Sequence, residues 1–592
     1  MTMAAFLALS SIALPWLGAV AVWLVGNRRL SANRRPEQLS GLQHGLAVFF
    51  SVAGAAAALL LLAYTSASPV LRLSTGRLAG DFTLVADGLA VFLVLIANGV
   101  GSLAVIFSVD YMAGDRQLGR YYLLVLIFIG AMSGLVLSGN LLFMFLFWEL
   151  TAFSSYALIS FHNDDPKAVA GGIKALIITQ FGGVGLLLGA MLAYGYLGSY
   201  QISSVLAQGS ELPAGILSLM AFGFLGAALA KSAQLPFHTW LPDAMEAPTP
   251  VSALIHAATM VNAGIYLLAR FYPAFAEVPG WRISIVVVGA LTALLAALLA
   301  CANDDLKRVL AYSTVSQLGY MTFAIGAGGV FASQFHLQSH AIFKALLFLS
   351  AGAVIHTVGT RDMREMGGLW RSMPFVATVF VIGSAGLAGL PLFNGFWSKE
   401  LILESAHVGA PLWALAIMVF VAGLTAYYSA RMVWLVFAGE GVNRAVEKAA
   451  LHRTPLAMRV ALAPLALLTL GSWLLAPAFL SWLQATLPYH LLEGPHSLGA
   501  LSHVLTEPLT YVALLVVALG LLGWWWAMRS ARRMPFELPA DFGFEHLNIF
   551  IKEFMLRISA TTQLTQTGQL SWNVVGMGLA LAALLLVMVI GG

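Results

Sequence analysis

Ionisable side chains lie inside long apolar segments of the sequence. Glu149 follows the run Phe-Met-Phe-Leu-Phe-Trp, Lys231 follows Gly-Ala-Ala-Leu-Ala, and Lys344 and the neighbours Lys399 and Glu400 lie in two further apolar segments. A charge at the centre of a bilayer costs about 2.5–3.5 kcal/mol even on lenient scales, so such residues usually mark an ion pathway. One such residue could instead reach the membrane surface or form a structural ion pair. Four segments that each carry one near a proline or a histidine favour transport.

Three of these polar side chains are spaced for contact along one helix. His336, His340 and Lys344 follow an i, i+4, i+8 pattern, which places them on one face. Two histidines at i and i+4 can bind zinc. However, the sequence nearby offers no third carboxylate or thiolate, and a lysine on the same face repels a cation, so we predict no metal site. Imidazole titrates near pH 6.5 and exchanges protons with neighbouring groups, which favours a proton relay.

Prolines and glycines interrupt two of the apolar segments beside the lysines. Pro236 lies one turn after Lys231, and Gly389 and Pro391 precede Lys399. Proline removes a helical hydrogen bond and frees a carbonyl, which a membrane tolerates only where the backbone is buried in protein or lines a cavity. The sequence therefore predicts two discontinuous helices next to buried lysines.

The composition supports a membrane protein and excludes several kinds of chemistry. The chain has 592 residues, of which 60% are hydrophobic and 9% charged, whereas soluble domains carry about 25% charged residues. Cys301 is the one cysteine, which excludes disulfides, iron–sulfur clusters and thiolate metal sites within this chain. The sequence has no dinucleotide-binding GxGxxG, no P-loop and no CxxCH motif, so we expect no cofactor in this chain.

Sixteen apolar runs are long enough to cross a bilayer core about 30 Å thick. They lie near residues 4–25, 42–64, 86–108, 120–138, 140–160, 170–194, 214–234, 248–271, 281–301, 308–327, 335–357, 374–404, 411–437, 456–476, 508–528 and 572–590. The expected fold is therefore an all-α integral membrane protein with about sixteen transmembrane helices.

The order of the spans predicts five regions. They are N-terminal transmembrane helices (1–110), a first inverted repeat (120–271), a second inverted repeat (281–437), C-terminal transmembrane helices (438–529), and an amphipathic lateral helix with a terminal transmembrane anchor (538–592). Each repeat contains five helices, of which one, in the corresponding position of each repeat, is broken. That arrangement is typical of inverted-repeat transporters.

The basic residues predict the orientation in the membrane. With Lys231, Lys344 and Lys399 set aside, only Arg72, Arg77, Arg270 and Arg282 among the Lys and Arg residues fall on the side shared by the two termini. Because cytoplasmic loops are enriched in Lys and Arg, both termini are expected on the periplasmic side. The expected location is the cytoplasmic (inner) membrane of a bacterium or archaeon, with an even number of spans.

The segment 538–569 has the pattern of an amphipathic helix. Phe544, Leu547, Ile551, Phe554 and Ile558 form an apolar stripe, and charged residues take the other face. We expect a helix along the cytoplasmic surface, about 48 Å long if the whole segment is helical. The alternative is an ordinary surface helix between two spans.

Several motifs together resemble a known family. One runs Lys231-Ser-Ala-Gln-Leu-Pro-Phe-His-Thr-Trp-Leu-Pro-Asp243 and continues to His256. The others are Phe-Trp-Glu149-Leu, Asp305-Leu-Lys-Arg-Val-Leu-Ala-Tyr-Ser-Thr-Val-Ser-Gln317, His336-xxx-His340-xxx-Lys344 and Ser-Lys399-Glu400. Over roughly residues 80–440 the chain resembles the antiporter-like subunits of respiratory complex I, energy-converting membrane hydrogenases and Mrp-type sodium/proton antiporters. The amphipathic segment and last span are similar to the distal L-type subunit of bacterial complex I.

The resemblance implies fourteen core helices around a hydrated axis at mid-membrane. It also implies roles for the buried groups. Glu149 would pair with Lys231 and modulate it, and His256 would link Lys231 to Lys344.

The rest of the implied route lies in the second repeat. His336 and His340 would line it, and Lys399, coupled to Glu400, would pass the ion to one side of the membrane. The chain departs from complex I subunits on the sixth helix, where Gln180 and Gly183 replace the usual Arg and Asp. His238 and the stretch Gly-Thr-Arg-Asp362 are more similar to the A-type subunit of Mrp antiporters.

Three functions are compatible with these features. The favoured one is a proton-translocating subunit, itself without redox chemistry, of a multisubunit redox-driven complex that is complex I-like or a membrane-bound hydrogenase. The alternative is an Mrp-type Na⁺/H⁺ antiporter subunit without electron transfer. The third, a redox protein that binds haem through His256 and His340, is disfavoured because the relay already accounts for both histidines. The expected partners are other membrane subunits, either redox or small antiporter subunits, and the lipid bilayer, with no nucleic acid.

The groups on the expected axis favour H⁺ over Na⁺ as the transported ion. Sodium needs several converging oxygens to replace its hydration shell. The axis offers mainly nitrogen groups, which exchange protons and repel Na⁺ when they are protonated.

Overall fold

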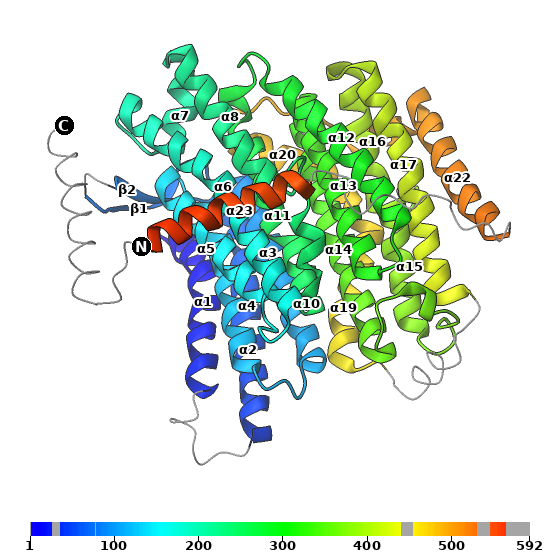
Figure 1. Cartoon of the computed structure of the whole chain (residues 1–592). Coiled ribbons are helices and arrows are strands. Elements are labelled where there is room, and N and C mark those ends of the chain that lie inside the picture. The colour runs from blue at the N-terminus through cyan, green and yellow to red at the C-terminus, as the bar shows by residue number, and fades with distance from the viewer. Residues whose placement is uncertain (1, 27–35, 77–78, 440–453, 530–544, 564–592) are drawn as a thin grey trace.

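The computed structural model describes residues 2–26, 36–76, 79–439, 454–529 and 545–563, and these residues form a helical bundle with one small sheet (Figure 1). The N-terminal part contains α1 (Met3–Gly26), α2 (Pro36–Leu61), α3 (Gly88–Tyr111), α4 (Leu118–Leu137), α5 (Leu141–Ile159), α6 (Pro166–Leu197), α7 (Ile202–Gln208) and α8 (Ala214–Lys231). The central part contains α9 (Trp240–Asp243), α10 (Thr249–Ala253), α11 (Met260–Phe275), α12 (Trp281–Ala302), α13 (Leu306–Gly326), α14 (Val330–Val358), α15 (Pro374–Ala388), α16 (Asn394–Gly409) and α17 (Leu412–Val433). The C-terminal part contains α19 (Leu456–Gly471), α20 (Ala476–Thr486), α21 (Leu498–Ser502), α22 (Pro508–Arg529) and α23 (Glu545–Gln563).

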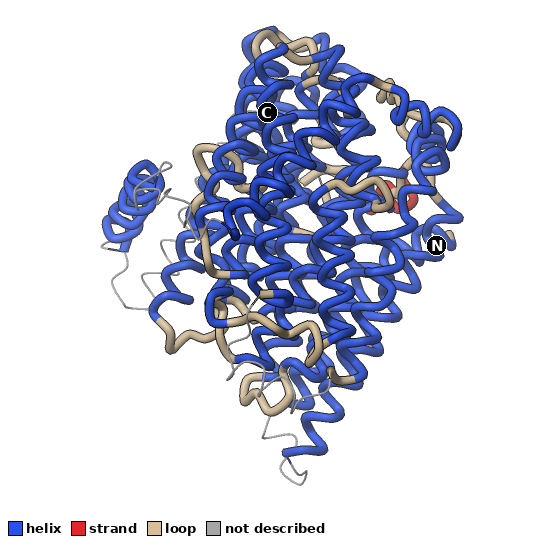
Figure 2. Tube along the Cα trace, turned by 90° about the vertical axis from the view of Figure 1, so that its right-hand side faces the viewer, coloured by secondary structure: helices blue, strands red, loops and turns tan. Residues whose placement is uncertain are grey.

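The long helices run side by side, as the view turned by 90° also shows (Figure 2). Thirteen helical segments among the described residues are long and apolar enough to cross a membrane. Each of the first fifteen spans expected from the sequence overlaps a helix, and the sixteenth, 572–590, lies outside the described residues. Two expected spans are missing from the thirteen, because α13 is rich in Ser, Thr and Gln and the span 374–404 is broken into α15 and α16. The chain is thus a mostly helical, multi-pass membrane protein.

A two-stranded antiparallel sheet is the exception to the expected all-α fold. It pairs β1 (Pro69–Ser74) with β2 (Asp81–Val85). The side-chain amide of Asn140 donates to the carbonyls of Ala79, at 3.1 Å, and Asp81, at 2.9 Å, and so fastens the hairpin to the start of α5. The hairpin falls in the polar gap between two predicted spans, where the apolar pattern carries little information.

Side-chain caps and glycines set several helix ends. Asn140 accepts hydrogen bonds from two amides at the start of α5, and Asp305 does the same for α13. Asp165 caps α6, whose first residue is Pro166, a favoured position for proline. Gly198 ends α6 in the left-handed conformation, with φ of 64°.

The two helix breaks expected from the sequence are confirmed. The first separates α8 from α9, between Lys231 and Trp240, and the second separates α15 from α16, between Ala388 and Asn394. Gly389, with φ of 81°, ends α15 in the left-handed conformation that glycine adopts most easily.

A further irregularity was not expected. The predicted span 248–271 is not one regular helix, because a π-helical segment at Leu254–Ala258 joins α10 to α11. Thr259, at the junction, has φ of −133° and ψ of −98°, outside the helical region. The segment carries His256, and π-helical turns often occur at functional sites.

Glycines bring α6 and α8 into close contact. A Cβ added to Gly185 of α6 would lie 2.2 Å from the carbonyl oxygen of Gly223 in α8. Small residues at such positions allow membrane helices to approach until their backbones touch. This packing fixes α8, and with it Lys231, against α6.

The helix α23 contains 19 residues and contacts α6. Figure 1 shows it crossing the bundle helices near their middle, whereas the sequence predicted a position along the cytoplasmic surface. Ile551, on the predicted apolar stripe, is buried, and the outer face of α6 exposes Phe181, Val184 and Leu188. Leu547 and Phe554 of the stripe stay exposed, so the contact with α6 covers only part of it. The rest of the expected lateral element, at 538–544 and 564–569, lies outside the described residues.

Candidate functional site

The first helix break places Lys231 at the last position of α8. Beyond it the chain turns through Ala233, which has a positive φ of 49°. The indole of Trp240 donates to the carbonyl of Ala230 at 3.0 Å, and the amide of Gln234 donates to the carbonyl of Leu229 at 2.8 Å. These bonds satisfy carbonyls that the end of α8 would otherwise leave unpaired in the protein core.

Lys231 is fully buried and points toward α5. Its Nζ donates to the backbone carbonyl of Trp148 at 2.8 Å and lies 4.8 Å from the centroid of the Trp148 ring. The ammonium therefore contacts the residue that immediately precedes Glu149. An electrostatic interaction with the Glu149 carboxylate adds to these contacts, and these are the two residues that the resemblance implied would pair.

The Glu149 carboxylate lies against α6. Both of its oxygens are buried, and within the described part of the chain neither forms a well-oriented hydrogen bond, although Gln180 is its polar neighbour. A Cβ added to Gly183 would lie 2.7 Å from Oε1 of Glu149. Gly183 therefore provides the space that the carboxylate occupies.

His256 is fully buried in the π-helical segment. Its ring centroid lies 5.1 Å from that of Phe348 on α14. Among the described residues, neither ring nitrogen has a hydrogen-bond partner. Buried polar atoms usually have partners, so unpaired ones commonly indicate water or a functional role.

The three-residue face of α14 points into the bundle, as expected. His336 interacts with Ser398 of α16 at 2.9 Å through Nδ1 and with Gln317 of α13 at 3.2 Å through Nε2. Both nitrogens of His340, one turn further on, have no hydrogen-bond partner among the described residues.

Lys344, the third residue of that face, bonds to α13. Its Nζ donates to the carbonyl of Leu310 at 3.2 Å and to the hydroxyl of Ser313. The serine hydroxyl in turn donates to the same carbonyl at 2.9 Å. Lys344 thus has its polar partners on α13, and it lies on the same face of α14 as His340.

The second helix break places Lys399 and Glu400. Lys399 Nζ donates to the carbonyl of Leu387 near the end of α15 at 2.5 Å and lies 5.7 Å from the centroid of the Tyr320 ring. Glu400 accepts a hydrogen bond from Thr510 of α22 at 2.8 Å. Both residues of the pair are thus held by a neighbouring segment.

The eight predicted residues fall into two groups. Glu149 and Lys231 form the first. The second is connected by electrostatic interactions around His340 and contains His256, His336, His340, Lys344, Lys399 and Glu400. Between the groups, Ser232 donates to the carbonyl of Val261 at 2.7 Å, and Oε1 of Gln234 and Oδ1 of Asn262 are buried without partners among the described residues.

Lys307 is a buried lysine that the sequence did not single out. Its Nζ donates to the carbonyls of Met245 and Ala247, at 2.6 Å each, and its charge acts on His256. The sequence placed it just outside a predicted span beginning at 308, so it counted as a loop cation. The signal was its position two residues after Asp305, inside the first turn of α13.

A charged hollow of about 440 Å³ lies at the end of the bundle that carries this lysine. It is lined by Lys167, Glu246, Asn303, Asp304, Asp305, Arg308, Arg361, Asp362 and Arg364. Arg361 pairs with Glu246 at 3.2 Å and with Asp305 at 3.3 Å. A hydrogen bond from Arg364 lowers the pKa of Asp362 from its ordinary value. The hollow is a network of ion pairs in contact with water.

Two family models match the chain. The model described as NADH:quinone oxidoreductase/Mrp antiporter, TM, matches residues 138–425. The model described as NADH-Ubiquinone oxidoreductase (complex I), chain 5 N-terminus, matches residues 73–122.

Curated relatives are similar over more than half of this chain. The chain is 42% identical over 401 residues to the Na(+)/H(+) antiporter A1 subunit of Staphylococcus haemolyticus, which is 62% of this chain and 49% of the relative. It is 44% identical over 347 residues to the protein of the same name from Staphylococcus aureus, 56% of this chain and 43% of the relative. The chain thus spans about half the length of the curated relatives it matches.

Two solved structures share the fold. The Mrp complex from Dietzia sp. DQ12-45-1b matches with a TM-score of 0.81 and 30% identity, over 99% of this chain and 63% of that one. The membrane-bound sulfane sulfur reductase (MBS), an archaeal respiratory membrane complex, matches with a TM-score of 0.69 and 24% identity, over 86% of this chain and 99% of that one. At 24% identity, the second match shows a similar fold and nothing more.

Proposed function

Because the chain belongs to the family of antiporter-like ion-translocating membrane subunits, we propose that it moves protons across the membrane through its buried Glu, Lys and His side chains. The observation that carries this proposal is the group around His340. Imidazoles and ammonium groups lie together there in the protein core, and four of the imidazole nitrogens, on His256 and His340, have no hydrogen-bond partner in the described part of the chain. Water between such groups would connect them into a proton path.

Each helix break has a role in this proposal. Lys231 takes up and releases a proton beside Glu149, whose negative charge favours the charged lysine. His256 passes the proton toward Lys344, and His340 and His336 carry it to Lys399. Glu400, held by Thr510, acts on Lys399 as Glu149 acts on Lys231.

The ion is proposed to be H⁺ because the described groups are of the wrong kind for Na⁺. A sodium site needs several oxygens that converge on one point. Along the proposed path the side chains that change charge are mainly nitrogen groups, and the two carboxylates lie at opposite ends, next to lysines. Charged ammonium groups repel Na⁺ at every step between them.

Two kinds of assembly could drive this chain. The sequence favoured a redox-driven complex, and the family match to NADH:quinone oxidoreductase is compatible with it. The 42% identity to the A1 subunit of a Na(+)/H(+) antiporter supports an Mrp-type assembly as the second candidate. Purifying the complex through a tag on this chain distinguishes the two, because co-purified redox subunits or small antiporter subunits would identify the partner set by mass spectrometry.

The orientation and the repeat structure are part of the proposal. The charged hollow would face the cytoplasm, and both termini the periplasm, in the cytoplasmic membrane of a bacterium or archaeon. The inverted repeats would be 120–271 and 281–437, within sixteen spans in total. Support comes from the breaks, which fall at α8/α9 in the fourth helix of the first block and at α15/α16 in the fourth of the second.

Reconstitution tests the proposed function. The tagged complex is placed in vesicles with an internal pH dye, and either a Na⁺ gradient or turnover of its redox partner is applied. We expect a pH change that disappears when Lys231 is replaced by methionine. A complex that moves no protons under either drive, although intact, would overturn the proposal. Proton movement in sodium-free buffer during redox turnover would exclude the Mrp-type alternative.

A further inference from the structure

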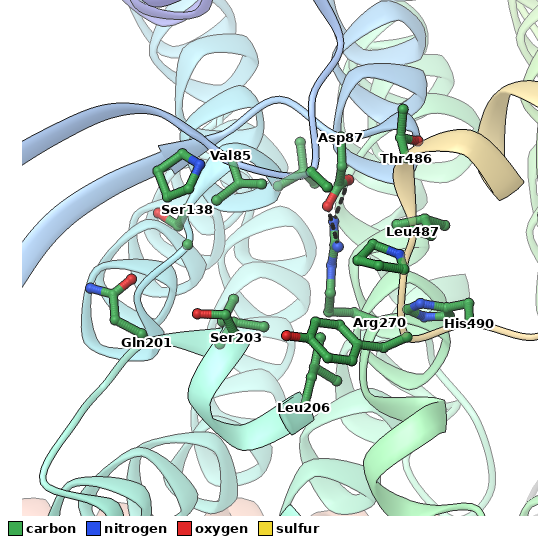
Figure 3. Close-up of a pocket in the computed structure, with 17 residues that line it drawn as sticks. Val85, Asp87, Ser138, Gln201, Ser203, Leu206, Arg270, Thr486, Leu487 and His490 are labelled. Carbon is green, nitrogen blue, oxygen red and sulfur yellow. Dashed lines mark hydrogen bonds and ion pairs between the residues drawn. The ribbon is translucent and has the colours of Figure 1, made fainter. Parts of the chain in front are cut away.

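A second pocket, mostly apolar with a few polar groups, lies at the other end of the bundle from the charged hollow. It is formed by the start of α3, the end of α4, the start of α7, α11 and the segment that follows α20 (Figure 3). The helix α12 runs 22 residues from near the end of α11 to the charged hollow, a rise of about 33 Å. The pocket and the hollow therefore lie near opposite surfaces of the membrane. None of the eight site residues predicted from the sequence lines this pocket.

The inner wall of the pocket is a buried ion pair. The guanidinium of Arg270 donates two hydrogen bonds to the Asp87 carboxylate, at 2.5 Å and 2.8 Å, which Figure 3 shows as dashed lines. Arg270 Nε also donates to the hydroxyl of Tyr266 at 3.2 Å, and that hydroxyl donates to the carbonyl of Val136 at 2.8 Å. A bidentate pair in this geometry is strong and well oriented.

The remaining walls include residues with buried polar atoms that lack a protein partner. Oγ of Ser138 and Nδ1 of His490 are both buried, and neither has a partner among the described residues. The cavity measures about 70 Å³, room for a few water molecules that would satisfy these atoms. Burial, followed by the charge of Arg270, lowers the pKa of His490 to about 4, so this histidine is neutral at pH 7 and offers hydrogen bonds without a charge.

A polar stripe leads inward from the pocket along α11. Thr259, Asn262, Tyr266 and Arg270 are spaced by three, four and four residues, which places them on one face of the helix. Every residue of α11 from Met260 to Phe271 is buried, so this face is inside the protein. The stripe begins next to the π-helical segment of His256, and Oδ1 of Asn262 is unpaired among the described residues.

We propose that this pocket is a hydrated vestibule, open to the membrane surface opposite the charged hollow, through which protons reach or leave the centre of the protein along the stripe of α11. Asp87 and Arg270 form its inner wall, and Tyr266 connects that wall to the stripe. The vestibule would connect the centre of the protein to that surface by a route separate from Lys399. This inference rests on the proposed function, because it supplies a path for the same protons.

Access to the pocket tests the first half of the inference. Ser138→Cys is introduced in a Cys301→Ala background, and Ag⁺ in nitrate medium is added to right-side-out or inverted vesicles. Ag⁺ binds thiols, is small enough for a cavity of this size, and does not cross the bilayer. Thiols that it reaches are then protected from alkylation by N-ethylmaleimide after denaturation.

We expect protection of Ser138→Cys in one vesicle orientation, the one that exposes the surface opposite the charged hollow. The matched control is Ser133→Cys, five residues earlier on α4, where the native hydroxyl is buried and bonded to Asn98 at 2.8 Å. This control should stay unprotected in both orientations. Equal labelling of the two variants, or protection of Ser138→Cys from the other surface, would overturn the vestibule.

Transport tests the second half. Tyr266→Phe removes one hydroxyl from the stripe and is expected to slow proton movement by about threefold to tenfold, the effect of losing one hydrogen bond. The control is Tyr121→Phe, which also removes a buried tyrosine hydroxyl, bonded to Ser108 at 2.7 Å, and should change the rate by less than about twofold. Ag⁺ bound at Ser138→Cys should likewise inhibit transport.

The outcomes separate this inference from the proposed function. If Lys231→Met abolishes proton movement while Tyr266→Phe and Ag⁺-treated Ser138→Cys transport at the wild-type rate, the path along α11 is wrong and the relay stands. If the wild-type complex moves no protons, the relay is wrong, and the Ag⁺ labelling pattern still decides whether the vestibule exists.

Discussion

Replacing Lys231 by methionine separates a transport role from a structural one. Methionine keeps an unbranched apolar side chain that fills most of the same space but cannot carry a proton. The native ammonium makes a 2.8 Å hydrogen bond to the Trp148 carbonyl and lies 4.8 Å from the Trp148 ring centroid. Arginine at the same position keeps the positive charge but does not release its proton at physiological pH.

The two roles predict different magnitudes. A hydrogen bond from a charged group contributes about 1.5–3 kcal/mol and a desolvated cation–π contact about 2 kcal/mol. Burying the ammonium costs several kcal/mol, which the methionine variant no longer bears. These terms nearly cancel once the Glu149 carboxylate, left without its partner, takes up a proton, so Lys231→Met should change the free energy of unfolding by less than about 2 kcal/mol. A lysine kept for a structural ion pair would instead cost about 3–5 kcal/mol when removed.

The assay combines vesicle transport with the melting temperature of the purified complex. We expect Lys231→Met and Lys231→Arg to reduce proton movement to background while the melting temperature changes little. The matched control is Lys174→Met, because Lys174 is also buried but forms an ion pair with Asp243 at 2.8 Å. That variant should lower the melting temperature more than it lowers transport. Wild-type transport by Lys231→Met, or a complex that fails to assemble without the lysine, would refute the reasoning.

Two further predictions follow from contacts at the first group and at the charged hollow. In Gly183→Ala the added Cβ would lie 2.7 Å from Oε1 of Glu149, whereas an ordinary contact begins at 3.4 Å. The carboxylate should therefore move by about 0.7 Å, and transport should slow. The control is Gly195→Ala on the same helix, whose added Cβ has no atom within 4 Å and which should leave the transport rate unchanged. Equal transport rates for the two variants would count against the packing described for Glu149. Asp362→Asn should lower the melting temperature at pH 7, because the folded state depresses the pKa of this carboxyl and gains stability above the unfolded value of about 3.9. The difference from wild type should shrink as the pH falls below about 4, and a constant difference down to pH 3 would show that the bond from Arg364 is not its source.

The helical framework could be predicted from the sequence because its signals are local. Apolar runs identified the helices, and Pro236 and Gly389 identified both breaks. The i, i+4, i+8 spacing identified the buried face that contains His336, His340 and Lys344. Each of these signals depends on residues within a few turns of one another.

The features that the sequence missed depend on partners far along the chain. The pair of Asp87 and Arg270 joins residues 183 positions apart, and neither looks unusual on its own, since both lie near the ends of predicted spans. The buried Lys307 ammonium donates its hydrogen bonds to two backbone carbonyls of the segment before α10, about sixty residues away in sequence. The π-helical segment at Leu254–Ala258 has no compositional sign, because its apolar pattern is compatible with a regular helix.

The close contact of α6 and α8 limits how the protein can move. Helices usually slide past each other on a layer of side chains, and that layer is missing where Gly185 meets Gly223. The two helices must therefore shift as one rigid body. Lys231 ends α8 whereas Glu149 belongs to α5, so a tilt of this body relative to α5 would change the separation of the two side chains. The packing of α5 against this body therefore sets the distance at which the carboxylate acts on the first lysine.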